Sequence, residues 1–174
     1  MRIIQTYSHL DGLEFLLVHN KKLWKEIQEV IKRHQYTARQ AHVQLVCTVN
    51  TKEQLQLRGD PNRFRQIMTN LIMNAIDAYK TMPDREVRTV EIELERSSKQ
   101  SLAISVSDHG IGIPKNRQDK VFQPFYSTKP TGMGIGLFVV KQLAEEYFRG
   151  TVSVSSDTNG TRFTLKLMGT EHAK

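Results

Sequence analysis

Two asparagines and one aspartate are spaced so that their side chains share one stripe of a predicted helix. Apolar residues recur at helical intervals over 62–80, and Asn70, Asn74 and Asp77 fall at i, i+4 and i+7 on the margin of that apolar face. Asparagine is a middling helix former, so two of them on one stripe need an explanation. Amide and carboxylate oxygens are ligands that Mg²⁺ prefers, which makes the stripe a candidate metal edge. The alternative is a hydrogen-bonded margin that faces solvent.

Two glycine-rich segments have the chemistry of a nucleotide site. In the first, residues 108–112, Asp108 can accept hydrogen bonds from an exocyclic amine, while Gly110 and Gly112 let the backbone pass close to a flat ligand. The same pattern also occurs in tight turns. The second segment, residues 132–137, opens a predicted helix whose free amides and positive dipole end favour phosphates. It is not a dinucleotide fingerprint, because its spacing is Gly-x-Gly-x-Gly and it follows a loop.

The elements that would position these residues follow from hydrophobic periodicity. Helices are predicted over about 22–40, 62–80 and 134–148. Alternating patterns predict strands near 43–49, 90–94, 102–106, 151–155 and 162–167. The connection from Asp108 to Gly134 is too long and too rich in glycine and proline for a plain loop, so we expect it to be functional. This order predicts an α/β fold, a two-layer sandwich of a mixed, mostly antiparallel sheet covered on one face by helices.

Composition narrows the class of protein. The 174 residues fit one domain, and 39% hydrophobic residues are enough for a packed core. No apolar run approaches the roughly 18 residues that span a bilayer, and the first residues lack a signal-peptide pattern. The single cysteine, Cys47, excludes an internal disulfide and is expected in the core. The net charge of +7 fits nucleic acid, an anionic membrane or a nucleotide as partner, without choosing among them.

Taken together, the motifs over residues 22–168 resemble the ATP-binding catalytic domain of sensor histidine kinases. This domain belongs to the superfamily of gyrase, chaperone, mismatch-repair and histidine kinase ATPases. The motifs are, in chain order, the N box at 70–75, the first glycine box at 108–112, the F box at 122–129, the second glycine box at 132–137 and a closing strand at 159–163. The F-box sequence Phe-Tyr-Ser-Thr-Lys and the short lid look most like the nitrogen-regulator branch. The resemblance implies a Bergerat-type ATP-binding fold with ATP and Mg²⁺ as cofactors.

The resemblance also implies a role for each motif position. Asn74 would bind Mg²⁺, and Asn70 and Asp77 would support the metal and phosphate side. Asp108 would accept from the adenine amine, and Lys129 would neutralise phosphate charge, so Asn70 and Lys129 are the catalytic candidates. Hydrolytic relatives carry a glutamate at the position of Asn70, and an amide is a very poor base, which favours transfer over hydrolysis. The other cofactor-binding candidates are Gly110, Gly112, Gly132, Met133, Gly134, Gly136, Leu137 and Thr161.

The resemblance further implies a division of the chain and a set of partners. Residues 1–20 would be the tail of a dimerisation and phosphoacceptor helix with its linker, 21–170 the ATP-binding catalytic domain and 171–174 a C-terminal tail. The acceptor histidine would lie on a dimerisation hairpin missing from this chain, because too few residues precede Leu23 for a helix pair, and His9 is not expected to be the acceptor.

The expected partners are therefore the phosphoacceptor hairpin of the parent kinase and, downstream, a response regulator. No nucleic acid is expected as a partner. Contact with a membrane is expected only through parts of the parent protein that are missing from this chain. The expected location is the cytoplasm, with the cytoplasmic part of a membrane sensor as an alternative. Alternatives for the function are a serine or other protein kinase of the same superfamily and a nucleotide-binding module without transfer activity.

Overall fold

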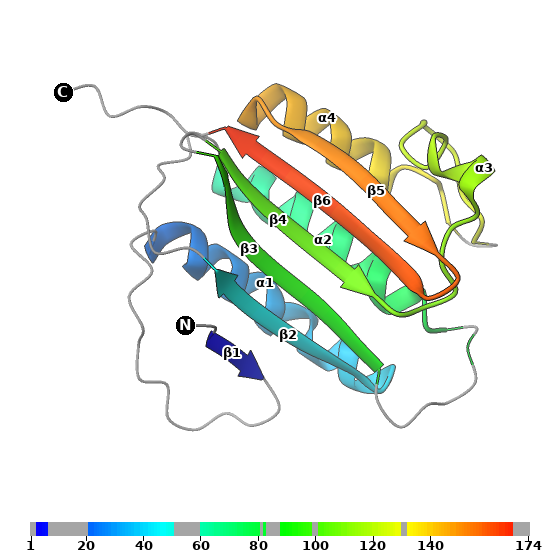
Figure 1. The fold of residues 1–174 in the computed structure, drawn as a ribbon, viewed down its shortest axis with the longest axis horizontal. Coiled ribbons are helices and arrows are strands. Elements are labelled where there is room, and N and C mark those ends of the chain that lie inside the picture. The colour runs from blue at the N-terminus through cyan, green and yellow to red at the C-terminus, as the bar shows by residue number, and fades with distance from the viewer. Residues whose placement is uncertain are drawn as a thin grey trace.

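The chain forms one sheet with its long helices packed against a single face (Figure 1). The computed structural model describes residues 3–6, 21–50, 60–80, 82, 88–98, 101–129 and 132–168. The helices in these ranges are α1 (Lys21–Gln40), α2 (Pro61–Asp77), α3 (Lys115–Gln118) and α4 (Gly136–Phe148). The strands are β1 (Ile3–Thr6), β2 (Val43–Asn50), β3 (Arg88–Ser98), β4 (Ser101–Asp108), β5 (Thr151–Asp157) and β6 (Gly160–Met168).

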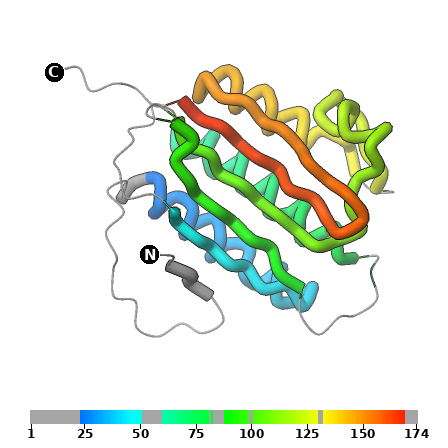
Figure 2. The backbone as a smooth tube through the Cα atoms, in the orientation of Figure 1, coloured from blue at the N-terminus to red at the C-terminus, as the bar shows by residue number. Residues whose placement is uncertain are grey.

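The six strands lie in the order β1-β2-β3-β4-β6-β5. Strands β2 and β3 run parallel, and the other neighbouring pairs are antiparallel. Helices α1, α2 and α4 cover one face of the sheet, and Figure 2 shows α2 in the middle of this layer, between α1 and α4. The two-layer α/β sandwich with a mixed, mostly antiparallel sheet is therefore confirmed.

Burial along the strands follows the pattern that the sequence predicts for β3. Val90, Ile92 and Leu94 are buried, and the glutamates between them are more exposed. Strand β4 differs, because all of its residues are buried. It lies between β3 and β6 in the sheet, and Arg162 on β6 reaches over it, donating hydrogen bonds to Ser107 on β4 (3.1 Å) and to Glu93 on β3 (2.7 Å).

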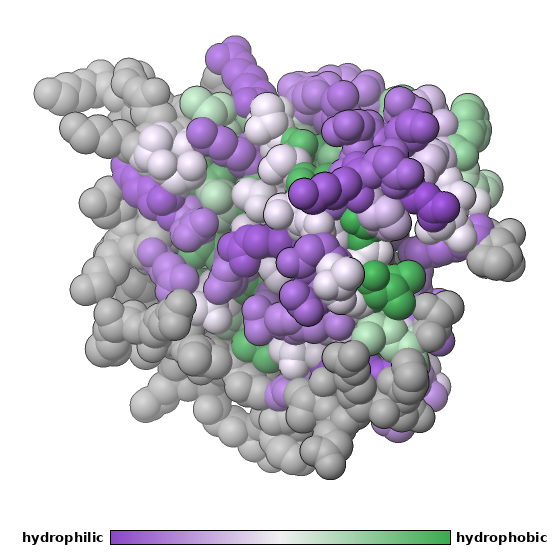
Figure 3. Space-filling model, turned by 45° about the vertical axis from the view of Figure 1, so that its right-hand side comes forward, coloured by the Kyte–Doolittle hydropathy of each residue, from purple (hydrophilic) through white to green (hydrophobic). Residues whose placement is uncertain are grey.

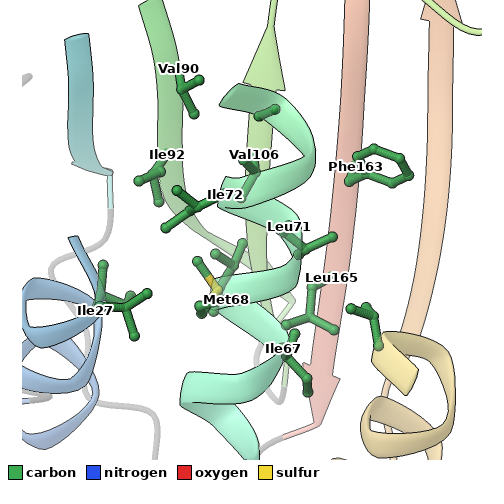
Figure 4. Packing of buried hydrophobic residues seen from close by; sticks show 14 of the residues in the cluster. Ile27, Ile67, Met68, Leu71, Ile72, Val90, Ile92, Val106, Phe163 and Leu165 are labelled. Carbon is green, nitrogen blue, oxygen red and sulfur yellow. The ribbon is translucent and has the colours of Figure 1, made fainter. Parts of the chain in front are cut away.

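Helix α2 supplies the centre of the core and also carries the polar stripe. Asp60 caps it by accepting a hydrogen bond from the Asn62 N–H (2.7 Å), and Pro61 occupies the first turn, where no donor is needed. The buried residues on its inner face, several of which Figure 4 shows, are Phe64, Ile67, Met68, Leu71, Ile72, Ala75 and Ile76. The helix ends at Asp77, three residues before the predicted end, and continues as a turn.

The main difference from the sequence prediction lies at residues 3–6. A helix tail is predicted there, but these residues form β1, which pairs antiparallel with β2, so the prediction is wrong for this segment. Ile3, Ile4 and Thr6 are β-branched, and the edge of β2 offers main-chain groups for pairing, which favours a strand. His9 and the tail 171–174 lie outside the described residues.

The interior and the surface of the described part agree with the composition. Cys47 is buried, as predicted, and burial raises the pKa of its thiol to about 12. The face in Figure 3 is mostly hydrophilic, with hydrophobic residues in small separate areas. Within the ranges given above, no helix combines the length and the apolar character needed to cross a membrane.

Candidate nucleotide-binding site

The polar stripe of α2 holds a positive charge from a distant part of the chain. Lys129 Nζ donates hydrogen bonds to Asn74 Oδ1 (3.0 Å) and to Asp77 Oδ2 (2.6 Å). Lys80 adds an ion pair, with its Nζ 2.7 Å from Asp77 Oδ1. Burial raises the pKa of Asp77, but the hydrogen bonds and charges of the two lysines outweigh burial and hold this pKa below its usual value. The stripe therefore binds a cation through one amide oxygen and one carboxylate.

Asn70, at the start of the stripe, lies beside the beginning of α4. A Cβ added to Gly136 would be 3.2 Å from Asn70 Oδ1, so the amide and the first residue of α4 are close neighbours. Helix α4 begins after Ile135 without a side-chain cap, which leaves N–H groups of its first turn without partners inside the helix. Such N–H groups favour an anion. Ligands for a cation thus lie next to donors for an anion, which suits a phosphate chain with a bound metal.

The glycines before α4 allow close contacts with the F-box segment. The Gly132 N–H donates to the Lys129 carbonyl (3.1 Å). Gly134 has φ of +68°, and a Cβ on it would lie 2.4 Å from the carbonyl carbon of Phe125. Only glycine fits this position, because both its conformation and its surroundings exclude a side chain.

Asp108 ends β4 as a buried carboxyl group. It is 4% exposed, and its Oδ1 accepts a hydrogen bond from the Gly110 N–H (2.9 Å). Burial raises the pKa of Asp108 to about 6, although hydrogen bonds from the main chain of Gly110 and Thr161 lower it. A carboxylate has room for several donors, so this group can recognise a ligand N–H, such as an exocyclic amine.

The loop after Asp108 is closely surrounded. Gly112 has φ of +69°, and a Cβ there would lie 1.8 Å from the Asp157 carbonyl oxygen, so a side chain is excluded. A Cβ on Gly110 would lie 2.6 Å from the Cβ of Ala78, which directly follows α2. Thr161 pairs with Asp108 in the register of β4 and β6. The loop is thus fixed against both the sheet and the end of α2.

The structure places most of the predicted site residues in two adjoining groups. The phosphate-side group consists of Asn70, Asn74, Asp77, Lys129 and Gly136. The base-side group consists of Asp108, Gly110, Gly112 and Thr161. The two groups approach each other where Gly110 lies against Ala78, the residue that follows Asp77.

Two other predicted residues do not contribute side chains to either group. Met133 is 78% exposed, and Leu137 is partly buried against the hydrophobic core. Gly132 and Gly134 lie between the F-box segment and α4, as described above.

Three residues that hold the base-side loop are not predicted as site residues from the sequence. The hydroxyl of Tyr79 accepts from the His109 N–H (2.8 Å). Ser156 Oγ accepts from the Ile113 N–H (2.7 Å), and Gln118 Nε2 donates to the carbonyls of Ile113 and Ser156 (2.8 Å each). Tyr79 gives a weak signal, as a residue with a hydroxyl at the end of an apolar series, whereas Ser156 and Gln118 give none.

The Lys129 ammonium held on α2, the uncapped start of α4 beside Asn70 and the buried Asp108 in a glycine loop are groups that suit a bound nucleotide. Residues 59–171 match the family described as histidine kinase-, DNA gyrase B- and HSP90-like ATPase. The chain belongs to this family. Its relatives are sensor histidine kinases, and the chain carries their catalytic ATP-binding domain.

Individual relatives show how far this likeness extends. The C4-dicarboxylate transport sensor protein DctB of Rhizobium meliloti is 33% identical over 113 residues, which are 65% of this chain and 17% of DctB. The sensor histidine kinase ZraS of Salmonella typhimurium is 32% identical over 131 residues, 75% of this chain and 27% of ZraS. The chain therefore spans about a quarter of these proteins or less.

Among solved structures, the catalytic domain of the histidine kinase ThkA, in a nucleotide-free form, has a TM-score of 0.70 and 27% identity. The comparison covers 86% of this chain and 95% of the ThkA domain. This likeness includes nearly the whole ThkA domain, so the fold described above is that of a histidine kinase catalytic domain.

Proposed function

We propose that this chain binds ATP with Mg²⁺ and transfers the γ-phosphoryl group to a histidine on a dimerisation hairpin of a sensor kinase. The observation that carries the proposal is the cation held on α2, where Lys129 Nζ lies 3.0 Å from Asn74 Oδ1 and 2.6 Å from Asp77 Oδ2. These oxygens lie on the helix that also contacts the start of α4, a suitable place for phosphate. That the relatives are sensor histidine kinases supports histidine as the acceptor.

We assign Mg²⁺ to Asn74, with Asp77 beside it. In the part of the chain that the structure describes, no group of three or more His, Cys, Asp or Glu side chains could hold a metal ion. Mg²⁺ at Asn74 would thus have few protein ligands and would rely on phosphate and water oxygens, which is usual for this ion. Mg²⁺ held there would supply positive charge that offsets the negative charge of the phosphate chain. Lys129 contributes a further positive charge to the phosphates.

Asn70 and Lys129 are the residues to which we assign catalytic roles. Asn70 lies beside the first residue of α4, where its amide can orient the phosphate chain. An amide cannot activate water as a base, so hydrolysis is not assisted and the phosphoryl group remains available for a protein nucleophile. Phosphoryl transfer depends mainly on positioning and charge neutralisation, which these two residues supply.

The base-side group is assigned to adenine. The carboxylate of Asp108 accepts from the adenine amine, and Thr161, its paired residue on the neighbouring strand β6, is assigned to the same contact. Gly110 and Gly112 are assigned to the same adenine contact, in a loop whose close packing admits only glycine at Gly112. The remaining cofactor contacts are assigned to the second glycine box, at Gly132, Met133, Gly134, Gly136 and Leu137.

The same proposal covers the organisation of the chain and its partners. We assign residues 21–170, together with the edge strand β1, to the ATP-binding domain and 171–174 to a tail. The partners are the phosphoacceptor hairpin and a response regulator, and the site of action is the cytoplasm, where ATP is available. The F-box sequence at 122–129 supports membership of the nitrogen-regulator branch.

A transfer assay tests the proposal. The chain, radiolabelled ATP and Mg²⁺ are mixed with a separately supplied dimerisation hairpin of the full-length kinase. We expect acid-labile phosphohistidine on the hairpin and little label on the chain itself. Asn74→Ala should abolish transfer because Mg²⁺ is lost, whereas His9→Ala should leave transfer unchanged.

Each other outcome contradicts a stated part of the proposal. Acid-stable label would identify a serine kinase, and ATP binding without transfer would identify a nucleotide-binding module. Acid-labile label on the isolated chain that disappears in His9→Ala would show that the chain holds its own acceptor. No binding at millimolar ATP would refute the nucleotide site itself.

A further inference from the structure

Tyr79 lies where the phosphate-side and base-side groups meet. It follows α2 in the turn 78–80 and is 2% exposed. Its hydroxyl oxygen accepts a hydrogen bond from the His109 N–H (2.8 Å) and donates one to the Thr89 carbonyl (2.6 Å). One buried hydroxyl therefore joins the end of α2, the start of β3 and the loop that follows β4.

These two hydrogen bonds form at the place where the pairing of β3 with β4 ends. The last pair in the register is Val90 with Asp108, so the next pair would be Thr89 with His109. The Tyr79 hydroxyl bridges the main-chain groups of these two residues. Tyr79 therefore fixes the point at which the chain leaves the sheet, immediately after Asp108.

The ring of Tyr79 is itself held in place. The guanidinium carbon of Arg88 lies 6.0 Å from the ring centroid, and its two terminal nitrogens donate to the carbonyls of Ala41 and Met82 (3.1 Å each). Burial raises the pKa of Tyr79, which keeps the phenol protonated, so that it can donate and accept at the same time. The hydroxyl is thus a fixed point relative to the sheet.

We propose that Tyr79 is a positioning residue for base recognition, which holds the His109 main chain so that the Asp108 carboxylate faces the amine of a 6-aminopurine. The proposal rests on the adenine role proposed for Asp108. The carboxylate also accepts from the Gly110 N–H. The loop is therefore held at His109 by the Tyr79 hydroxyl and at Gly110 by the carboxylate itself. Loss of the hydroxyl leaves the His109 N–H without this partner and allows the carboxylate to turn.

The effect should be confined to the base-side group. Tyr79 itself donates to Thr89 and accepts from His109, and neither bond involves the oxygens that hold Lys129. A change at the hydroxyl should therefore alter selectivity for the base and leave phosphate binding intact. A purely structural role would weaken both.

Calorimetry on the whole chain tests this inference with Tyr79→Phe, which removes the hydroxyl and keeps the ring against Arg88. Three ligands are compared. Mg-ADP carries the 6-amino group, Mg-IDP has an oxygen in place of this amine, and Mg-tripolyphosphate has no base and reports on phosphate binding alone. We expect ADP affinity to fall by about 3- to 10-fold, because the hydrogen bond between the Asp108 carboxylate and the amine is weakened, with IDP and tripolyphosphate unchanged. Tyr36→Phe, at a position 73% exposed on α1, is the matched control and should change nothing.

The outcomes separate this inference from the proposed function. Failure of the unmodified chain to bind ADP refutes the proposed function. Normal ADP binding with an unchanged ratio of ADP to IDP affinity in Tyr79→Phe overturns the inference, as does equal weakening of all three ligands. If the variant does not fold, hydrogen exchange of the unmodified chain decides: slow exchange of the His109 amide supports the inference, and fast exchange overturns it.

Discussion

Replacement of Asp108 by Asn should change how the stability of the domain depends on pH. The Asp108 carboxyl is 4% exposed, and burial raises its pKa from 3.8 to about 6. In the folded state the charged form is therefore disfavoured, and the carboxyl reduces stability when the pH is above 6. As the pH falls through 6, the folded protein takes up a proton that the unfolded chain binds only near pH 4, so stability returns. The Asp108→Asn variant has no carboxyl at this position and should show no such transition.

The size of the effect follows from the two pKa values. A difference of about two units corresponds to roughly 3 kcal/mol between the protonation states. Between pH 8 and pH 4.5, where most of this difference is recovered, the unmodified chain should gain about 2 kcal/mol of unfolding free energy relative to Asp108→Asn. The amide introduced in Asp108→Asn does not titrate, so its own effect on the unfolding free energy is the same at both pH values and cancels in this comparison.

Urea denaturation of both proteins at several pH values between 8 and 4.5 measures the effect. Asp119→Asn is the matched control, since Asp119 is an exposed aspartate on the same long connection and its replacement also removes one carboxyl group. A difference for Asp108→Asn that is the same at every pH would refute the reasoning. So would a difference of opposite sign, which would mean that the fold stabilises the charged carboxylate.

Two further predictions concern ligand binding. Asp108→Ala should remove the discrimination between ATP and GTP, a loss of roughly 1 to 3 kcal/mol from the unpaired amine, and competition calorimetry that shows unchanged discrimination would contradict the role of Asp108. Gly134→Ala should weaken Mg-ADP binding, because φ of +68° and a Cβ 2.4 Å from the Phe125 carbonyl carbon force this segment to move. Full ADP affinity in that variant would show that the segment before α4 does not need this conformation.

Local patterns predict the elements of the fold well, because each pattern is contained in the element itself. The apolar series over 62–80 predicts α2, and the alternation of Val90, Ile92 and Leu94 predicts the one-sided burial of β3. Residues 3–6 are predicted wrongly, since their pairing depends on the edge of β2, about forty residues away in the sequence.

Contacts within the site are harder to predict than the identity of its residues. The motif positions predict that Asn74, Asp77 and Lys129 lie near a phosphate chain. They do not indicate that Lys129 binds to the other two, because Lys129 lies more than fifty residues from both of them in the sequence. Tyr79 is predicted only as a core residue, since its main-chain partners, Thr89 and His109, belong to other elements and leave no mark on the helical pattern.

The contact between Lys129 and α2 also affects which ions can compete for these oxygens. The ammonium is part of the chain, so its local concentration at Asn74 and Asp77 is set by chain geometry rather than by the surrounding solution. Any free ion that binds here therefore replaces an ammonium group of charge +1. Replacement by a sodium or potassium ion leaves the positive charge beside these oxygens unchanged, whereas replacement by a divalent ion increases it by one unit. The tethered lysine thus disfavours monovalent ions before coordination geometry has any effect.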